Sequence, residues 1–166
     1  MNLEKAVEFM KKKHEGQKRK QGTPYYTHPL AVAKLLKDKG FSEEYQLVGL
    51  FHDLIEDTDA SYEEIVLLSN EEVAEAVKLL TKTDGYVMAE YIGNIKRNEM
   101  ARMVKLADRI HNLSESPNAN SKFQAKYIKE TKEWYVDLAK GTIFEEDLNR
   151  ELNNLIRVHE SLWLEK

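Results

Sequence analysis

The chain has 166 residues, of which 42% are hydrophobic and 33% are charged, a balance typical of a globular protein. This length favours one domain, predicted over residues 1–166, with enough chain to bury a sizeable core. The formal net charge is −4, so no general attraction to nucleic acid or anionic lipid is expected. Because the chain has no cysteine, disulfides and thiolate metal sites are excluded.

The N-terminal residues lack the apolar core of a signal peptide, and no apolar stretch reaches the length that spans a membrane. We therefore expect a soluble cytoplasmic protein that binds neither a membrane nor nucleic acid.

Amphipathic helical periodicity covers most of the chain. The first predicted helix starts at Leu3, and after a Gly/Pro-containing loop a second covers residues 30–39. Ser42 is predicted to cap the helix that carries His52-Asp53, and Ser61 opens a capping box with Glu64. A further helix is predicted from about residue 70 to 82.

The remaining helices are predicted over 86–97, over 100–113, and as two segments within residues 121–163. No useful stretch alternates with period two, so strands are not expected. The predicted fold is an all-α helical bundle, with its informative motifs over about 14–113 and C-terminal helices over 121–163.

His52 and Asp53 lie within the apolar run from Leu47 to Ile55. Such a run belongs to the core, where an imidazole beside a carboxylate is costly unless something compensates it. A divalent cation would compensate both, since neutral imidazole nitrogen and ionised carboxylate oxygen are both metal ligands. The alternative is an ordinary core histidine whose hydrogen bonds are satisfied by the protein.

A second acidic residue, Asp108, lies among apolar residues of the predicted helix 100–113 and is expected to point inward. It needs a cation, either Arg109 or a metal, although Arg109 also falls on a polar stripe of this helix. His28 precedes Pro29 at the start of another helix. Together, His28, His52, Asp53 and Asp108 would leave positions for water on Mn²⁺ or Fe²⁺, with Zn²⁺ also possible.

Glu56 and Asp57 follow His52 and Asp53 at a spacing of four residues, so they are expected one helical turn beyond them. Crowded carboxylates favour a proton on one of the two, which suits a group that orients water or protonates a leaving oxygen. The alternative is that this acidic pair merely ends an exposed helix.

Three segments resemble motifs of the Rel/Spo alarmone hydrolases, a branch of the HD-domain metal phosphohydrolases. The first runs from His14 to Pro29 and includes Arg19-Lys20 and Thr23-Pro24-Tyr25-Tyr26-Thr27-His28-Pro29. The second is Phe51-His52-Asp53-Leu54-Ile55-Glu56-Asp57-Thr58. The third is Val104-Lys105-Leu106-Ala107-Asp108-Arg109-Ile110-His111-Asn112-Leu113. They follow the family's order and lie near its separations.

This resemblance implies an all-helical HD-domain hydrolase that removes the 3′-pyrophosphate from (p)ppGpp with Mn²⁺. It places the metal on His28, His52, Asp53 and Asp108, and catalytic roles on Glu56 and Asp57. It also implies that Arg19 packs against the purine, that Lys20 meets phosphate, and that Asn112 contacts the ribose.

The resemblance leaves two alternatives open. Ser114-Glu115 stand where the family usually has Arg-Thr, so the substrate could be another nucleotide, such as a nucleoside monophosphate or a nucleotide pyrophosphate. A catalytically silent nucleotide-binding module is the second alternative, against which the acidic pair Glu56-Asp57 argues. We expect a stand-alone hydrolase of small nucleotides that could form a homo-oligomer.

Overall fold

The computed structural model describes residues 2–164, and every regular element in that range is helical. The β structure described there is a single isolated antiparallel bridge between Lys18 and Pro24. The all-α prediction is therefore confirmed. Residues 1 and 165–166, the ends of the predicted domain, lie outside the described residues. Within residues 2–164 no helix combines the length and the apolar character needed to cross a membrane.

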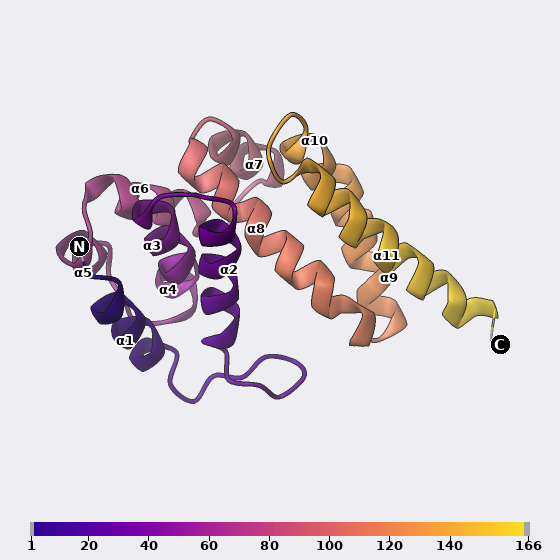
Figure 1. The fold of residues 1–166 in the computed structure, drawn as a ribbon, viewed down its shortest axis with the longest axis horizontal. Helices are drawn as coiled ribbons and strands as arrows, with labels where there is room; N and C mark the ends of the chain where they lie inside the picture. The colour runs from indigo at the N-terminus through magenta and orange to yellow at the C-terminus, as the bar shows by residue number, and fades with distance from the viewer. Residues whose placement is uncertain (1, 165–166) are drawn as a thin grey trace. The chain divides into compact units, whose positions relative to one another are not determined.

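The chain divides into two compact units, Met1–Lys105 and Leu106–Lys166, while one domain over the whole chain stays a prediction. The first unit contains α1 (Leu3–Lys13), α2 (Thr27–Asp38), α3 (Glu43–Phe51), α4 (Leu54–Asp57), α5 (Tyr62–Leu68), α6 (Glu71–Leu80), α7 (Met88–Lys96) and the start of α8 (Glu99–Glu115). The second contains the rest of α8, η1 (Ser116–Asn118), α9 (Ser121–Glu130), the π-helical turn η2 (Thr131–Tyr135), α10 (Val136–Ala139) and α11 (Glu145–Leu164). Figure 1 labels the α-helices.

Helix α3 is the centre of the first unit and packs against α1, α2 and α6. Its contact with α2 is close at Gly49, where an added Cβ would lie 3.1 Å from Leu36 Cδ1 and 3.3 Å from the backbone nitrogen of Ala33. Leu47 and Phe51 from α3 are fully buried in this core. A glycine at the contact thus lets α2 and α3 approach closely along the segment that leads to His52.

The helix predicted to carry His52 and Asp53 is interrupted at these two residues. Helix α3 ends at Phe51, α4 starts at Leu54, and His52-Asp53 form the turn between them. The imidazole Nδ1 of His52 lies 2.6 Å from the carbonyl oxygen of Gly49 and so competes with the backbone for this acceptor. Asp57 N still donates to Asp53 O at 2.9 Å, which keeps the predicted spacing of one helical turn.

The predicted caps have mixed outcomes. The capping box is confirmed, because Glu64 N donates to Ser61 Oγ at 3.1 Å and Ser61 N donates to Glu64 Oε2 at 2.9 Å. Ser42 is the N-cap residue of α3, as predicted, but its side chain makes no capping hydrogen bond.

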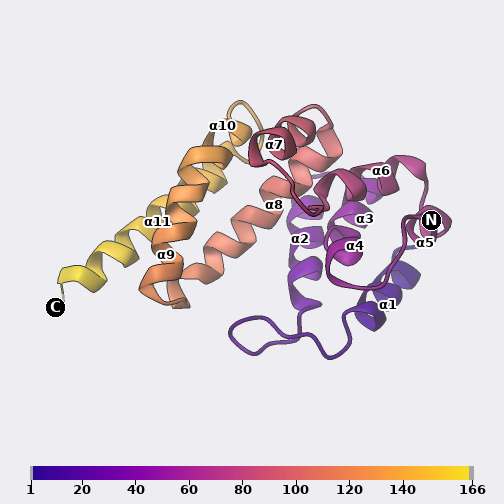
Figure 2. The ribbon, with the colours of Figure 1, turned by 180° about the vertical axis from the view of Figure 1, so that it is seen from behind.

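A loop between α1 and α2 presents the residues of the first motif (Figure 2). Its tip is a tight turn, in which Arg19 N donates to Thr23 O at 2.8 Å and Gly22 N donates to Arg19 O at 2.9 Å. Gly22 has φ of +95°, a conformation that side-chain-bearing residues rarely adopt. The turn exposes the side chain of Lys20, whereas that of Arg19 is half-buried.

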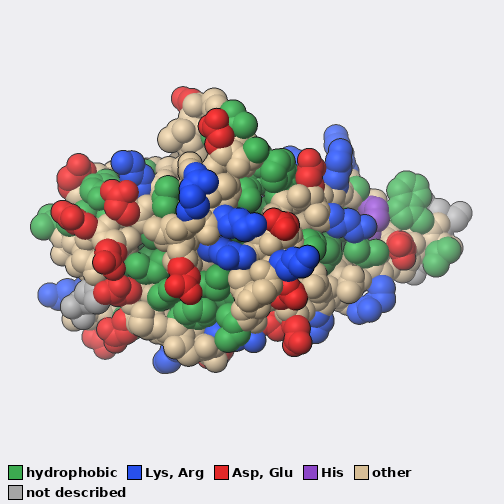
Figure 3. Space-filling model, turned by 90° about the horizontal axis from the view of Figure 1, so that it is seen from above, with side chains coloured by type: hydrophobic (Ala, Val, Ile, Leu, Met, Phe, Trp, Pro, Cys, Tyr) green, Lys and Arg blue, Asp and Glu red, His purple; other side chains and the backbone are tan. Residues whose placement is uncertain are grey.

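In the second unit, α9 and α11 lie side by side in both ribbon views. Within residues 121–163, where two helical segments are predicted, regular α-helix is interrupted by η2, in which Thr131 Oγ1 donates to Tyr127 O at 2.7 Å. On the face drawn in Figure 3, acidic and basic side chains are interspersed, in keeping with the net charge of −4.

Candidate metal centre

The centre of the site is the contact between His52 and Asp53. His52 is 3% exposed, and its Nδ1 must donate to the carbonyl oxygen of Gly49, because a carbonyl oxygen only accepts. In the neutral ring the lone pair is then on Nε2, which lies 3.0 Å from Asp53 Oδ2. Two hydrogen-bond acceptors at this distance require a cation, either a proton or a metal ion.

Tyr25 holds the carboxylate of Asp53 in this position. Its hydroxyl donates to Asp53 Oδ2 at 2.5 Å, a length typical of a charge-assisted O–H···O⁻ bond. Sequence reasoning quoted Tyr25 within the first motif but gave it no role. Hydropathy could not reveal it, since a tyrosine in a loop is equally consistent with simple packing.

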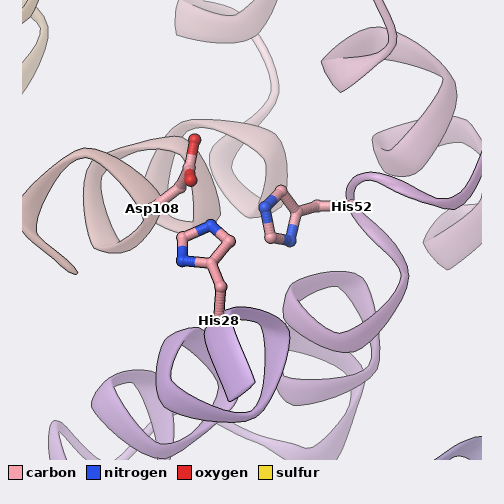
Figure 4. Close-up of side chains that lie close together, drawn as sticks. All are labelled: His28, His52 and Asp108. Carbon is pink, nitrogen blue, oxygen red and sulfur yellow. The ribbon is translucent and has the colours of Figure 1, made fainter. Parts of the chain in front are cut away.

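His28 brings a second imidazole to the same place. It lies in the first turn of α2, is 1% exposed, and has its ring centroid 5.2 Å from that of His52. One ring nitrogen of each residue lies within 4.8 Å of the other (Figure 4). Two imidazoles and a carboxylate, without thiolates, form a nitrogen and oxygen donor set suited to a divalent transition metal. His28 and His52, together with Asp108, make up a group of side chains able to hold a metal ion.

Asp108, also drawn in Figure 4, stands on the part of α8 that belongs to the second unit. It is 7% exposed, which confirms the prediction that it is buried. Its Oδ1 accepts a hydrogen bond from Asn112 Nδ2 at 3.1 Å. The two residues predicted to bind metal and ribose are thus linked one helical turn apart.

Arg109, which falls on the predicted polar stripe of this helix, is buried. It is 4% exposed, and its guanidinium carbon lies 4.0 Å and 3.8 Å from the ring centroids of Tyr127 and Tyr135. Its Nη2 forms an ion pair with Glu130 Oε1 at 2.6 Å. Two aromatic faces and a carboxylate compensate the buried cation, and Glu130 is the ion-pair partner of Arg109.

Glu56 and Asp57 end α4 with exposed side chains. Glu56 Oε1 accepts a hydrogen bond from the backbone nitrogen of Lys82 at 2.6 Å, which fixes one of its oxygens. Desolvation raises the pKa of Asp57 to about 6, with smaller contributions from the negative charges of Asp53 and Glu56 and an opposing one from His52. Crowding is thus the lesser cause of the raised pKa, and desolvation is the larger.

His14 and Gln17 also belong to this neighbourhood, although sequence reasoning gave them no role. His14 is 1% exposed, and its ring centroid lies 4.8 Å from that of Tyr25. Its Nδ1 lies 2.8 Å from Gln17 Oε1, and Gln17 Nε2 donates to the carbonyl oxygen of Asp57 at 2.9 Å. Desolvation lowers the pKa of His14, against the hydrogen bond with Gln17 and the charge of Asp53.

Arg19 and Lys20, the predicted substrate residues of the loop, lie on the turn between α1 and α2. The guanidinium carbon of Arg19 lies 6.0 Å from the ring centroid of Tyr25, so Arg19 borders the residue that holds Asp53. Lys20 follows on the same turn with an exposed side chain.

Comparison with known proteins adds relatives of stated function. The family model described as HD domain matches residues 6–142. A probable guanosine-3′,5′-bis(diphosphate) 3′-pyrophosphohydrolase of Synechocystis sp. is 37% identical over 137 residues, which make up 76% of this chain and 18% of that protein. The GTP pyrophosphokinase rsh of Brucella melitensis is 35% identical over 164 residues, covering 92% of this chain and 22% of the relative. The chain thus spans about a fifth of the length of these relatives.

Solved structures give a likeness over most of the fold. One is described as a metazoan ortholog of SpoT that hydrolyzes ppGpp; it has a TM-score of 0.80 and 25% identity, and the match covers 92% of this chain and 94% of the other. Another, lmo0812 from Listeria monocytogenes EGD-e, has a TM-score of 0.62 and 25% identity, with 81% of this chain and 98% of the other covered.

Proposed function

Because the chain belongs to the HD-domain family, we propose that it is a metal-dependent phosphohydrolase acting on guanosine-3′,5′-bis(diphosphate). In the proposed reaction, a water oxygen forms a bond to the phosphorus joined to the ribose 3′ oxygen. The bond between that phosphorus and the 3′ oxygen breaks, which releases GDP and pyrophosphate. The names of the Synechocystis relative and of the metazoan structure support this choice of substrate.

The contact that carries the proposal is the 3.0 Å separation between His52 Nε2 and Asp53 Oδ2. Two acceptors at this distance repel each other unless a cation lies between them, and the buried His52 has little access to water that could supply compensation. A divalent ion satisfies both, and the hydrogen bond from Tyr25 then orients the carboxylate as outer partners of metal ligands commonly do.

We assign His28, His52, Asp53 and Asp108 as the metal ligands, two through nitrogen and two through oxygen. The assignment of Asp108 rests on its place in the third motif and on its burial. Four such ligands leave positions for water on a six-coordinate ion, for which Mn²⁺ is the proposed occupant and Fe²⁺ or Zn²⁺ the alternatives. A divalent ion there lowers the pKa of bound water toward neutrality.

Glu56 and Asp57 are assigned to the water and to the leaving oxygen. They stand one turn beyond the proposed ligands, and the Lys82 backbone holds one oxygen of Glu56. The second oxygen of Glu56 is available to orient the attacking water and take its proton. Asp57 is proposed to relay a proton to the ribose 3′ oxygen as it leaves.

Arg19, Lys20 and Asn112 are assigned to the substrate itself. A planar guanidinium can stack on a purine, and an exposed ammonium on a glycine-containing turn suits a phosphate. Where the family usually has Arg-Thr, Glu115 forms an ion-pair contact with His111 at 3.1 Å. Base recognition is therefore tested with more than one nucleotide.

The test is turnover by purified protein that has been stripped with a chelator and reloaded with Mn²⁺. Ion-exchange chromatography should show ppGpp converted to GDP and pyrophosphate in equal amounts, while Asp53→Asn forms neither. The adenosine counterpart of ppGpp tests whether the enzyme requires guanine. A deoxynucleoside monophosphate tests whether it requires the 3′-pyrophosphate. Protein that binds Mn²⁺ but turns over none of these compounds would contradict the proposed function.

A further inference from the structure

His14 is a buried polar residue that is neither a proposed metal ligand nor a proposed substrate residue. It is the C-cap residue of α1, where its backbone nitrogen donates to Met10 O at 3.1 Å. Its side chain is 1% exposed and packs on Tyr25, the residue that holds Asp53. Buried polar atoms are normally hydrogen-bonded, so each of the two ring nitrogens of His14 is expected to have a partner.

The hydrogen bonds of Gln17 fix the tautomer of His14. The carbonyl oxygen of Asp57 can only accept, so the Gln17 atom 2.9 Å from it is the amide nitrogen. The other end of the amide is therefore the oxygen, and it faces His14 Nδ1 at 2.8 Å. Nδ1 must donate to this oxygen. In the neutral ring, the lone pair of His14 is on Nε2.

That Nε2 is buried and has no hydrogen-bond partner among the described residues. Buried acceptors of this kind are commonly satisfied by ordered water or by a ligand. The His14 ring packs on Tyr25. The ring centroid of Tyr25 lies 6.1 Å from that of His28, and the Tyr25 hydroxyl donates to Asp53. His14 therefore lies one side chain away from two of the proposed ligands. The available acceptor thus lies beside the candidate metal centre.

We infer that His14 is a positioning residue of this centre, whose Nε2 accepts a hydrogen bond from a water molecule held there. The inference rests on the proposed metal binding. Gln17 keeps the lone pair on Nε2 and, through the carbonyl of Asp57, ties His14 to the acidic pair. The pair His14 and Gln17 therefore connects the proposed ligands to the proposed proton-transfer residues.

Two substitutions separate the ring nitrogens. In His14→Gln the side-chain amide reaches the position of Nε2 and can still accept, whereas in His14→Asn it reaches only the position of Nδ1. Electron paramagnetic resonance of added Mn²⁺ measures metal affinity without reference to activity. We expect His14→Asn to lower this affinity by about 10- to 100-fold, as loss of an outer partner commonly does, and His14→Gln to retain most of it. His159→Gln, in the second unit, is the matched control.

The opposite ranking, with His14→Asn near the wild type and His14→Gln weak, would assign His14 a structural role through Nδ1 and overturn the inference. Equal losses in both variants would overturn it as well. If His14→Asn does not fold, nitrogen-15 NMR of the wild-type protein decides instead. It should find the proton on Nδ1, and a Nε2 signal that moves when Zn²⁺ is added; a proton on Nε2 contradicts the inference. Protein that binds Mn²⁺ with the expected ranking but does not hydrolyse ppGpp refutes the proposed substrate alone.

Discussion

Each unit of the chain buries a polar cluster, and the two clusters balance their charges differently. In the second unit, Arg109 is compensated within the protein by Glu130 and by the faces of Tyr127 and Tyr135. In the first unit, His52 and Asp53 bring two acceptor atoms to 3.0 Å, a contact that needs a cation. A cluster that is balanced internally serves the fold, whereas one whose two acceptors share a cation can take a metal ion in place of a proton.

This comparison predicts opposite outcomes for removing one charge from each cluster. A variant in the first unit should lose metal and activity but keep its fold. A variant in the second unit should lose stability, because it leaves a buried charge without its partner.

The largest effect is expected from Asp53→Asn. The amide keeps the size of the side chain and removes the charge that a metal requires, so Mn²⁺ affinity should fall by at least about 100-fold, with loss of ppGpp turnover. The metal-free variant should melt at or above the wild-type temperature, because its amide can donate to His52 Nε2. Calorimetric titration and thermal melting measure the two effects.

The control for that variant is Asp59→Asn, two residues beyond the acidic pair. Asp59 has a side chain that is 88% exposed and pairs with Lys13 at the surface. The Asp59→Asn variant should bind Mn²⁺ with the affinity of the wild type. Equal affinity in Asp53→Asn and the wild type would remove Asp53 from the ligand set.

Glu130→Gln tests the cluster of the second unit. Breaking a buried ion pair commonly costs several kcal/mol, but Glu130 keeps 30% of its side chain exposed, so we expect a loss of about 2 kcal/mol in the free energy of unfolding. Urea denaturation measures it. Glu133→Gln, at an exposed position of η2, should change stability by less than about 0.5 kcal/mol. If the two variants are equally stable, the compensation of Arg109 comes from the tyrosines alone.

The sequence was sufficient to predict the helical fold and to single out three candidate side chains for the site. His52 and Asp53 could be singled out because hydropathy shows two polar residues inside an apolar run, whereas His28 was singled out by its place before Pro29 at the start of a helix. The end of α3 at Phe51 could not be predicted, since it accompanies a contact between the His52 side chain and the Gly49 carbonyl. Such competition is decided by side-chain direction, which periodicity does not contain.

Arg109, Tyr25 and His14 show the limit of local patterns. The burial of Arg109 could not be predicted from its own helix, because its partner Glu130 is 21 residues away, beyond any helical spacing. The hydroxyl of Tyr25 meets Asp53 from 28 residues away. Residues whose roles depend on distant partners become visible only when the fold places those partners together.

Gly49→Ala should disturb the metal cluster through packing rather than charge. The added methyl group would lie 3.1 Å from Leu36 Cδ1 and 3.3 Å from a backbone nitrogen, so α2 and α3 must separate slightly. We expect a loss of about 1 kcal/mol in unfolding free energy, together with weaker Mn²⁺ binding, because Gly49 O orients His52.

Gly93→Ala in α7 is the matched control, because its nearest neighbour would be the flexible end of Arg97 at 3.7 Å. There, alanine should stabilise the helix by up to about 1 kcal/mol. A destabilised Gly49→Ala variant that binds Mn²⁺ as tightly as the wild type would show that the α2–α3 contact serves the fold alone.

The smallest effect is expected from the titration of Asp57. Its pKa is raised from 3.8 to about 6 by desolvation and then by Asp53 and Glu56, so between these pH values the folded metal-free protein holds more protons than the unfolded chain. The free energy of unfolding should therefore fall as pH rises from about 4 to about 6, by less than about 1 kcal/mol after solvent screening. Urea denaturation of Asp57→Asn should lack this part of the slope.

A metal ion should shift that titration, which returns to the difference between the two clusters. A divalent cation near Asp53 favours the ionised form of Asp57, so carbon-13 NMR should give a carboxyl pKa near 6 without metal and a lower value with saturating Zn²⁺. The Arg109–Glu130 pair already contains its own cation, so the carboxyl signal of Glu130 should not respond to Zn²⁺. A response at Glu130 without one at Asp57 would place the metal at the Arg109–Glu130 cluster and contradict the assignment to His52 and Asp53.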